Sequence, residues 1–136
     1  MNSALKPELF WLVLTSLMTA LLFVPYIVNR MKEHGIGPAL WNPQPDTRPK
    51  APWAERLMRA HANAVENLVV FAPLVLALQL TGISTATTAS ACMVYFFVRL
   101  AHAILYTFAV PLLRTVAFII GFACQMVLAL TLLHIS

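Results

Sequence analysis

Four long hydrophobic stretches, separated by short polar segments, account for most of this chain of 136 residues. Asp, Glu, Lys and Arg do not occur in residues 9–29, 67–98, 100–113 and 115–136. A helix needs about 20 mainly apolar residues to cross the hydrocarbon core of a bilayer. The pattern therefore predicts four membrane-spanning helices, at approximately residues 8–31, 54–81, 84–109 and 112–135.

The composition is also typical of a membrane protein. Hydrophobic residues make up 60% of the chain and charged residues only 10%, whereas about 25% of the residues in a soluble domain are charged. We expect a single all-α domain over residues 1–136, an integral membrane four-helix bundle. The first stretch is long for the core of a signal peptide and no clear small-residue cleavage site follows it, so we expect a retained helix.

The basic residues gather around two of the three predicted connections. Most belong to the first connection or to the helix ends beside it, namely Arg30, Lys32, Arg48, Lys50, Arg56 and Arg59. Arg114 stands beside the third connection, and the second connection (residues 81–85) is uncharged. The positive-inside rule then predicts that the first and third connections face the cytoplasm and both termini face outward. The net charge of +4 reflects this topology, and we expect no nucleic-acid partner.

The first connection is rich in proline, with Pro38, Pro43, Pro45, Pro49 and Pro52. Prolines at this density favour an extended, stiff loop over a helix. Such a loop either covers a site at the cytoplasmic surface or simply connects two helices, and the sequence leaves both interpretations open.

Polar side chains are aligned on two of the predicted helices. Arg59, Asn63 and Glu66 follow the spacing i, i+4, i+7, which places them on one helix face. The third helix carries a second polar face, formed by Tyr95, Arg99, His102 and Tyr106. Charges at the centre of a bilayer cost roughly 2.5–3.5 kcal/mol on insertion scales. These faces must therefore meet each other, water, another helix or a ligand.

Arg30 ends the first predicted helix and Arg114 begins the fourth. In an antiparallel bundle they lie at the depth of the two polar faces, so all four helices send polar groups to one level. Guanidinium groups bind carboxylates with two hydrogen bonds, and the carboxylate of Glu66 suits an ammonium group. This set fits a small zwitterionic peptide with excess negative charge.

Structural roles are the competing interpretation of the same residues. Arg59, Asn63 and Glu66 could form ion pairs and hydrogen bonds between helices, and Arg99 could pair with Glu66 inside the bundle. Cys92 and Cys124 lie inside predicted helices without metal-ligand spacing and are expected to be buried apolar residues. The four histidines are scattered, so no metal site is expected.

The chain resembles the membrane-associated proteins in eicosanoid and glutathione metabolism, the MAPEG family. The resemblance rests on the run Glu55-Arg56-x-x-Arg59-Ala60-His61-x-Asn63-x-x-Glu66-Asn67, on Pro73, and on Arg99-x-x-His102-x-x-x-Tyr106. It extends over nearly the whole chain in length, helix count and position of the long first loop. It implies a four-helix protomer that forms a homotrimer and binds glutathione between subunits in the cytoplasmic half of the membrane.

The resemblance also assigns roles to individual residues. Glutathione ligands are implied at Arg30, Arg59, Asn63, Glu66, His102 and Tyr106. Arg114 is similar to the arginine that faces the glutathione sulfur, with Tyr106 as a helper. Asn67 stands where the leukotriene synthase branch has tyrosine, and Ala62 where the prostaglandin branch has arginine. The chain therefore looks more like the bacterial members, which implies a bacterial inner membrane.

Three functions follow as hypotheses. The first is a membrane-bound, glutathione-dependent transferase or peroxidase, in which Arg114 stabilises a thiolate that attacks lipophilic electrophiles from the bilayer. The second is a non-catalytic lipid-binding or scaffold member of the same fold. The third is a small four-helix transporter, for which Glu66 is a poor proton carrier because the nearby arginines would hold it ionised.

Overall fold

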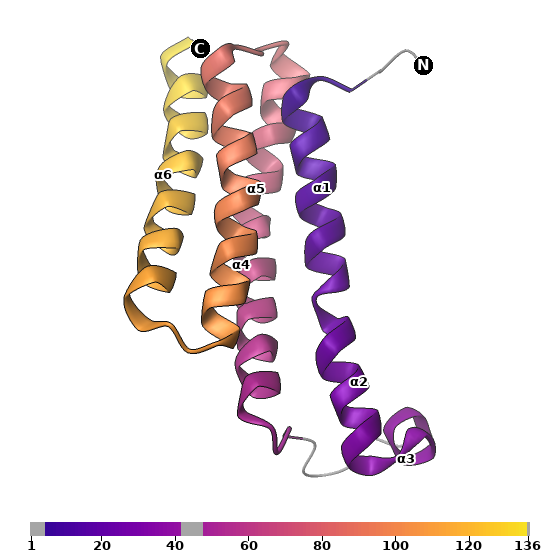
Figure 1. Ribbon diagram of the computed structural model, residues 1–136. Helices are drawn as coiled ribbons and strands as arrows, with labels where there is room; N and C mark the ends of the chain where they lie inside the picture. Colours follow the sequence, from indigo (N-terminus) through magenta and orange to yellow (C-terminus); the bar gives the residue numbers. More distant parts are fainter. Residues whose placement is uncertain (1–4, 42–47, 136) are drawn as a thin grey trace.

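The protein is described by a computed structural model in which residues 5–41 and 48–135 are placed. These residues form an all-helical bundle (Figure 1). The helices are α1 (Pro7–Leu21), α2 (Phe23–His34), α3 (Ile36–Trp41), α4 (Pro52–Thr81), α5 (Ala86–Thr107) and α6 (Pro111–Ile135).

Four segments of the described chain are long and apolar enough to cross a membrane. They are Pro7–His34, which combines α1 and α2, followed by Pro52–Thr81, Ala86–Thr107 and Pro111–His134. The predicted spans differ from these by three residues or fewer at each end. The four-helix architecture expected from the hydrophobic pattern is therefore confirmed.

Local sequence signals explain where the helices begin and end. Pro52 and Pro111 occupy first-turn positions of α4 and α6, where the missing N–H costs nothing. α4 ends at Thr81 and is followed by Gly82, which adopts the left-handed conformation (φ 75°) that favours glycine. Thr85 and Thr88 then form a reciprocal capping box at the start of α5.

The first span is divided at Leu22, although the hydrophobic pattern predicts one continuous helix. Pro25 has no N–H, so the carbonyl of Leu21 loses its usual helical partner four residues on. At the junction the Leu22 N–H bonds the Thr19 carbonyl, three residues back, at 3.4 Å. α4, by contrast, continues through Pro73 as one helix.

The first connection also differs from the extended loop predicted for it. A short helix, α3, occupies Ile36–Trp41, and Pro38 lies in its first turn, where proline is tolerated. The Glu33 carboxylate accepts hydrogen bonds from the Asn29 side chain and from the backbone N–H groups of Lys50 and Ala51, at 2.8–3.2 Å. These bonds tie the end of the connection to α2. Pro43 and Pro45 lie outside the described residues.

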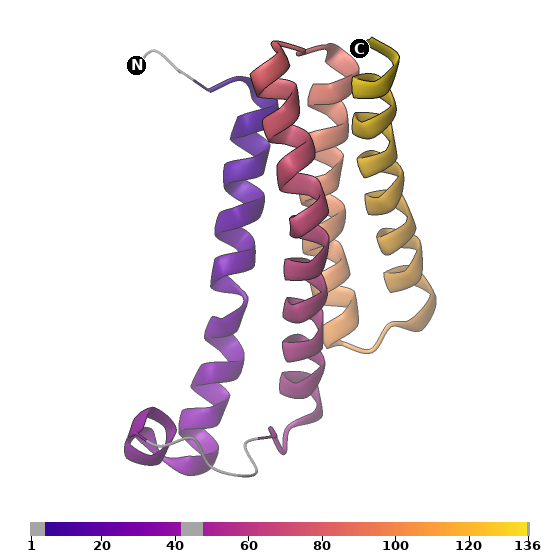
Figure 2. The same cartoon turned by 180° about the vertical axis from the view of Figure 1, so that it is seen from behind.

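The helices run alternately up and down, with both ends of the chain at one end of the bundle (Figure 1). α5 lies between α1 and α6 in this view, and the view from behind places α4 beside α1 and α2 (Figure 2). The first connection and the α5–α6 connection share the opposite end. We call this the loop end.

The core lies where α4, α5 and α6 meet α1. The rings of Phe71 and Tyr95 stack with centroids 3.9 Å apart, and Val75, Cys92 and Leu128 pack in the same cluster. Cys92 and Cys124 are both buried, as expected. Many large apolar side chains remain exposed on the outer surface, including Leu80, Phe108 and Leu133. Such a surface suits lipid rather than water.

Candidate functional site

The polar face of α4 divides into an outward part and an inward part. Arg59 and Glu66 are exposed on the surface of the protomer, whereas Asn63 is half-buried. Nη2 of Arg59 pairs with Oε1 of Glu55 at 3.2 Å, in an exposed ion pair. The ion pairs within residues 5–41 and 48–135 do not include Glu66. The carboxylate of Glu66 therefore faces outward about 21 Å along α4 from its first residue.

Asn63 is held by α5. Its side-chain oxygen accepts a hydrogen bond of 2.6 Å from Nη2 of Arg99, a residue only 2% exposed. Arg99 therefore does not pair with Glu66 in the structure. Its guanidinium bonds instead to the side-chain amide of Asn63, which lies one helical turn before Glu66 on α4. The side-chain nitrogen of Asn67 also bonds to Asn63, at both the backbone and the side-chain oxygen.

Gln125 of α6 extends this hydrogen-bonded chain to a third helix. Its side-chain nitrogen donates to the Asn67 carbonyl at 3.1 Å and to the Tyr95 hydroxyl at 3.4 Å. The chain from Arg99 through Asn63 and Asn67 to Gln125 thus joins α4, α5 and α6. Sequence reasoning missed Gln125, although an amide inside an otherwise apolar span is itself a signal of a polar contact.

Two buried nitrogens at this level remain unsatisfied among the described side chains. They are Nε of Arg99 and Nδ1 of His102, and His102 is only 4% exposed. Buried polar atoms without a partner are uncommon in folded proteins and call for a water, an ion or a ligand. Gly121 of α6 faces Arg99, and an added Cβ there would lie 3.5 Å from Cδ of Arg99.

Tyr106 and Arg114 lie beside His102. The rings of His102 and Tyr106 have centroids 5.7 Å apart. The guanidinium carbon of Arg114 lies 4.6 Å from the centroid of the Tyr106 ring, within the range of a cation–π interaction. Three residues predicted for the site, from α5 and α6, are therefore brought together. We call His102, Tyr106 and Arg114 the loop-end cluster.

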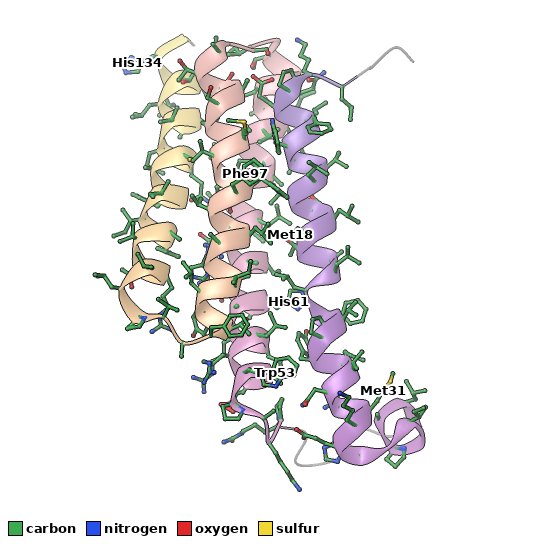
Figure 3. The ribbon with its side chains drawn as sticks, viewed as in Figure 1. Met18, Met31, Trp53, His61, Phe97 and His134 are labelled. Atoms are coloured by element: carbon green, nitrogen blue, oxygen red, sulfur yellow. The ribbon has the colours of Figure 1, made fainter. Side chains whose placement is uncertain are left out.

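Arg30 lies in different surroundings, on α2. It lines a small cleft with Tyr26, Glu33, Pro49 and other residues. Beside it, the hydroxyl of Tyr26 hydrogen-bonds to Nδ1 of His61 at 2.7 Å and links α2 to α4. His61 of α4 therefore has a contact within the protomer, toward α2 (Figure 3).

Neither of two cavities in the described part of the chain gathers all the predicted ligands. The cleft beside Arg30 and a larger apolar groove between α1 and α5 are not lined by any of the other predicted ligands. These other residues are Arg59, Asn63, Glu66, His102, Tyr106 and Arg114. Their roles as glutathione ligands stay predictions. No group of three potential metal ligands occurs among the described residues.

Comparison of the sequence with models of known protein families gives a match to one family. The model of the MAPEG family matches residues 9–134, which is nearly the whole chain. No curated protein matches the sequence.

Proposed function

The chain belongs to the MAPEG family, and its four apolar helices make it an integral membrane protein; from this premise we propose that it is a glutathione-dependent transferase or peroxidase. Its second substrates would be lipophilic electrophiles or hydroperoxides that arrive through the bilayer. The peptide cosubstrate would arrive from the aqueous phase at the loop end.

The observation that carries this proposal is the outward position of Arg59 and Glu66 on a membrane-spanning helix. An ionised carboxylate is costly to leave against hydrocarbon. A neighbouring copy of the chain that covers α4 removes this cost. A ligand between the copies gives Glu66 a partner and gives Arg59 a second partner besides Glu55. We therefore propose a homotrimer with glutathione bound at each subunit interface, which closes as a ring.

The chemistry of the ligand matches the residues assigned to it. Glutathione carries two carboxylates and one ammonium group, so arginine forks such as those of Arg59 and Arg30 suit its acids. The carboxylate of Glu66 suits its ammonium. Asn63 is positioned as a hydrogen-bond donor to glutathione. Arg99 already donates to its side-chain oxygen at 2.6 Å, which leaves the N–H groups of its side-chain amide as donors.

Arg114 is proposed to stabilise the reactive form of the thiol. A thiol with an ordinary pKa of about 8.5 is only a few per cent ionised at neutral pH. A guanidinium beside the sulfur favours the thiolate and lowers that pKa. The contact with the Tyr106 ring restrains Arg114, and the Tyr106 hydroxyl is the second donor proposed for the sulfur.

The proposed transfer forms a bond between the sulfur and the electrophilic carbon of the second substrate. The electron pair of the broken bond leaves with the departing atom, which takes up a proton. With a hydroperoxide the thiolate attacks the distal oxygen and the O–O bond breaks, so that an alkoxide leaves, takes up a proton as an alcohol, and the attacked oxygen stays on sulfur as a sulfenic acid. The thiol of a second glutathione then attacks this sulfur, forms the disulfide and releases the oxygen as water.

We also propose the topology of the site. The loop end carries the first and third connections, where the basic residues gather, so the positive-inside rule places it in the cytoplasm and the two termini outside. A bacterial inner membrane is the setting in which this orientation would apply.

Two measurements on detergent-solubilised protein test the proposal. Reduced glutathione should raise the unfolding temperature in a saturable way, and S-methylglutathione should do so without adding thiolate absorbance in the ultraviolet. Binding of both peptides with no thiolate signal from either would favour the non-catalytic lipid-binding alternative. Absence of any stabilisation by millimolar glutathione would refute the proposal.

A further inference from the structure

An apolar cavity in the described part of the chain is separate from the loop-end cluster. It is a groove of about 470 Å³ between α1 and the second half of α5, with Leu57 of α4 at its floor. Its walls are almost wholly apolar, with Leu17 and Met18 from α1, Ile104 from α5, and Phe108, the residue that follows α5. Met18 lies on the side of α1 that faces α4 and α5 (Figure 3). The volume of the groove is within the range of small-molecule sites.

The mouth of the groove lies on the outer surface of the protomer. Leu17, Leu21 and Ile104 are about half exposed, and Phe108 is 70% exposed. Leu17, Leu21 and Ile104 belong to helices that are long and apolar enough to cross the membrane. An occupant of this groove therefore comes from the hydrocarbon phase and presents methylene groups rather than hydrogen-bonding groups to its walls.

The end of the groove near the loops has a different chemistry. Thr107, the last residue of α5, lines the groove, and its carbonyl accepts a hydrogen bond of 2.8 Å from Nε of Arg56. This bond uses only one of the five N–H donors of the guanidinium. The ion pairs within residues 5–41 and 48–135 join Arg59 to Glu55 and His34 to Glu33. Arg56 therefore forms no ion pair with a carboxylate of these residues.

Arg56 lies at the depth expected for lipid headgroups. It is in the second turn of α4 and beside the end of α5, at the loop end of the bundle. Trp53, one turn earlier on α4, is partly exposed at the same end, where aromatic rings are typical of the membrane interface. An apolar groove with a cation at its interfacial end matches an amphiphile that has an acyl tail and an anionic head.

We propose that this groove is a binding site for an anionic membrane phospholipid. One acyl chain lies between α1 and α5, and the phosphate is held by Arg56. A bilayer supplies such lipids at high local concentration, and basic residues between helices commonly bind their headgroups. The site does not include the residues assigned to glutathione, so either proposal can fail without the other.

Native mass spectrometry of the purified full chain provides the test. The protein is stripped of lipid in detergent and offered equal amounts of dioleoyl phosphatidylglycerol and dioleoyl phosphatidylcholine. We expect retention of phosphatidylglycerol in preference to phosphatidylcholine. Ile104→Trp, which fills the groove from a half-exposed position, should abolish retention. The control Ile119→Trp changes an equally apolar exposed residue of α6 and should retain the lipid.

The headgroup contact is tested separately. Arg56→Gln should reduce the preference for phosphatidylglycerol about fivefold, which corresponds to the ~1 kcal/mol that one basic residue contributes at an anionic surface. Lys6→Gln removes the same charge at the opposite end of the bundle and should leave the preference unchanged.

Three results would overturn the proposal. Equal retention of the two lipids would remove the role of Arg56, and unchanged retention in Ile104→Trp would remove the groove. A change of oligomeric mass in Ile104→Trp, recorded in the same spectra, would identify the groove as a contact between copies of the chain instead.

Discussion

The two ends of this bundle differ in whether their buried polar groups have hydrogen-bond partners. At the end that carries the termini, Glu8 is only 3% exposed, yet its carboxylate accepts hydrogen bonds from the hydroxyls of Ser84 and Thr88. Toward the loop end, Arg99 and His102 are buried as deeply but each leaves a nitrogen without a partner. The first arrangement is complete within one protomer, and the second is not.

The difference separates residues that hold the fold from residues that are available to a ligand. A buried carboxylate with every contact made resists change, because removal of one member leaves the others unsatisfied. Unsatisfied buried nitrogens, together with an outward carboxylate at Glu66, are instead places where a water, a ligand or a second subunit gains free energy by binding. Substitutions at the two ends should therefore change different measurements.

Arg114→Ala is expected to have the largest effect. Loss of the guanidinium removes the proposed stabilisation of the thiolate, and loss of one such electrostatic donor typically lowers kcat by about 10²–10³. The thiolate absorbance of bound glutathione should fall in parallel, while its affinity should change little because the other ligands remain. Turnover and ultraviolet difference spectra measure these quantities.

Arg48→Ala, which also removes a loop-end arginine, is the matched control and should keep normal turnover. Full activity of Arg114→Ala with an undiminished thiolate signal would exclude its assigned role.

Glu66→Gln should act on binding rather than on chemistry. A hydrogen bond to a charged group contributes about 1.5–3 kcal/mol, so glutathione affinity should weaken between about tenfold and a hundredfold. Isothermal titration with glutathione measures the change. Glu55→Gln, on the same helix, removes a carboxylate whose partner is the exposed Arg59, and its effect should be much smaller.

A stronger effect of Glu55→Gln than of Glu66→Gln would reverse this order and would place the ammonium of glutathione nearer the start of α4.

Glu8→Ala should reduce stability without affecting glutathione. The substitution removes the carboxylate that accepts from the hydroxyls of Ser84 and Thr88, and leaves Thr88 only the Thr85 carbonyl as an acceptor. The expected cost is about 1–3 kcal/mol in the free energy of unfolding. Equilibrium unfolding in mixed detergent measures this change. Glu55→Ala, at an exposed ion pair, should lose no more than about 1 kcal/mol. Equal stability losses in the two variants would contradict the contrast between the ends.

The spans were predictable from sequence because runs of more than twenty apolar residues have few other stable structures. The polar faces were predictable for a different reason. The helical period fixes which residues share a face, and it places Arg59 with Asn63 and Arg99 with His102. The direction of each face was not, because helix rotation depends on packing between segments. Sequence alone therefore allowed an ion pair between Arg99 and Glu66. In the packed bundle Arg99 instead donates a hydrogen bond to the side-chain oxygen of Asn63.

Glu8 illustrates the other limit of sequence reasoning. Its partners Ser84 and Thr88 follow it by 76 and 80 residues, and no local pattern connects them. A charge at the start of the first span is most simply interpreted as an exposed interfacial residue. Only the three-dimensional arrangement of α1 beside α5 reveals that it is buried.

Gly121→Ala should have the smallest effect and tests the surroundings of Arg99. An added Cβ would lie 3.5 Å from Cδ of Arg99 and 3.7 Å from side-chain atoms of Tyr95 and Val98, which are ordinary van der Waals distances. Replacement of glycine by alanine in a helix then raises the free energy of unfolding by about 0.4–1 kcal/mol, because the unfolded chain loses freedom. Gly121→Leu has no such space and should displace Arg99 from Asn63, with loss of stability. Loss of stability already in Gly121→Ala would mean that α6 packs more closely against Arg99, and the unsatisfied Nε would then have no room for a water or an anion.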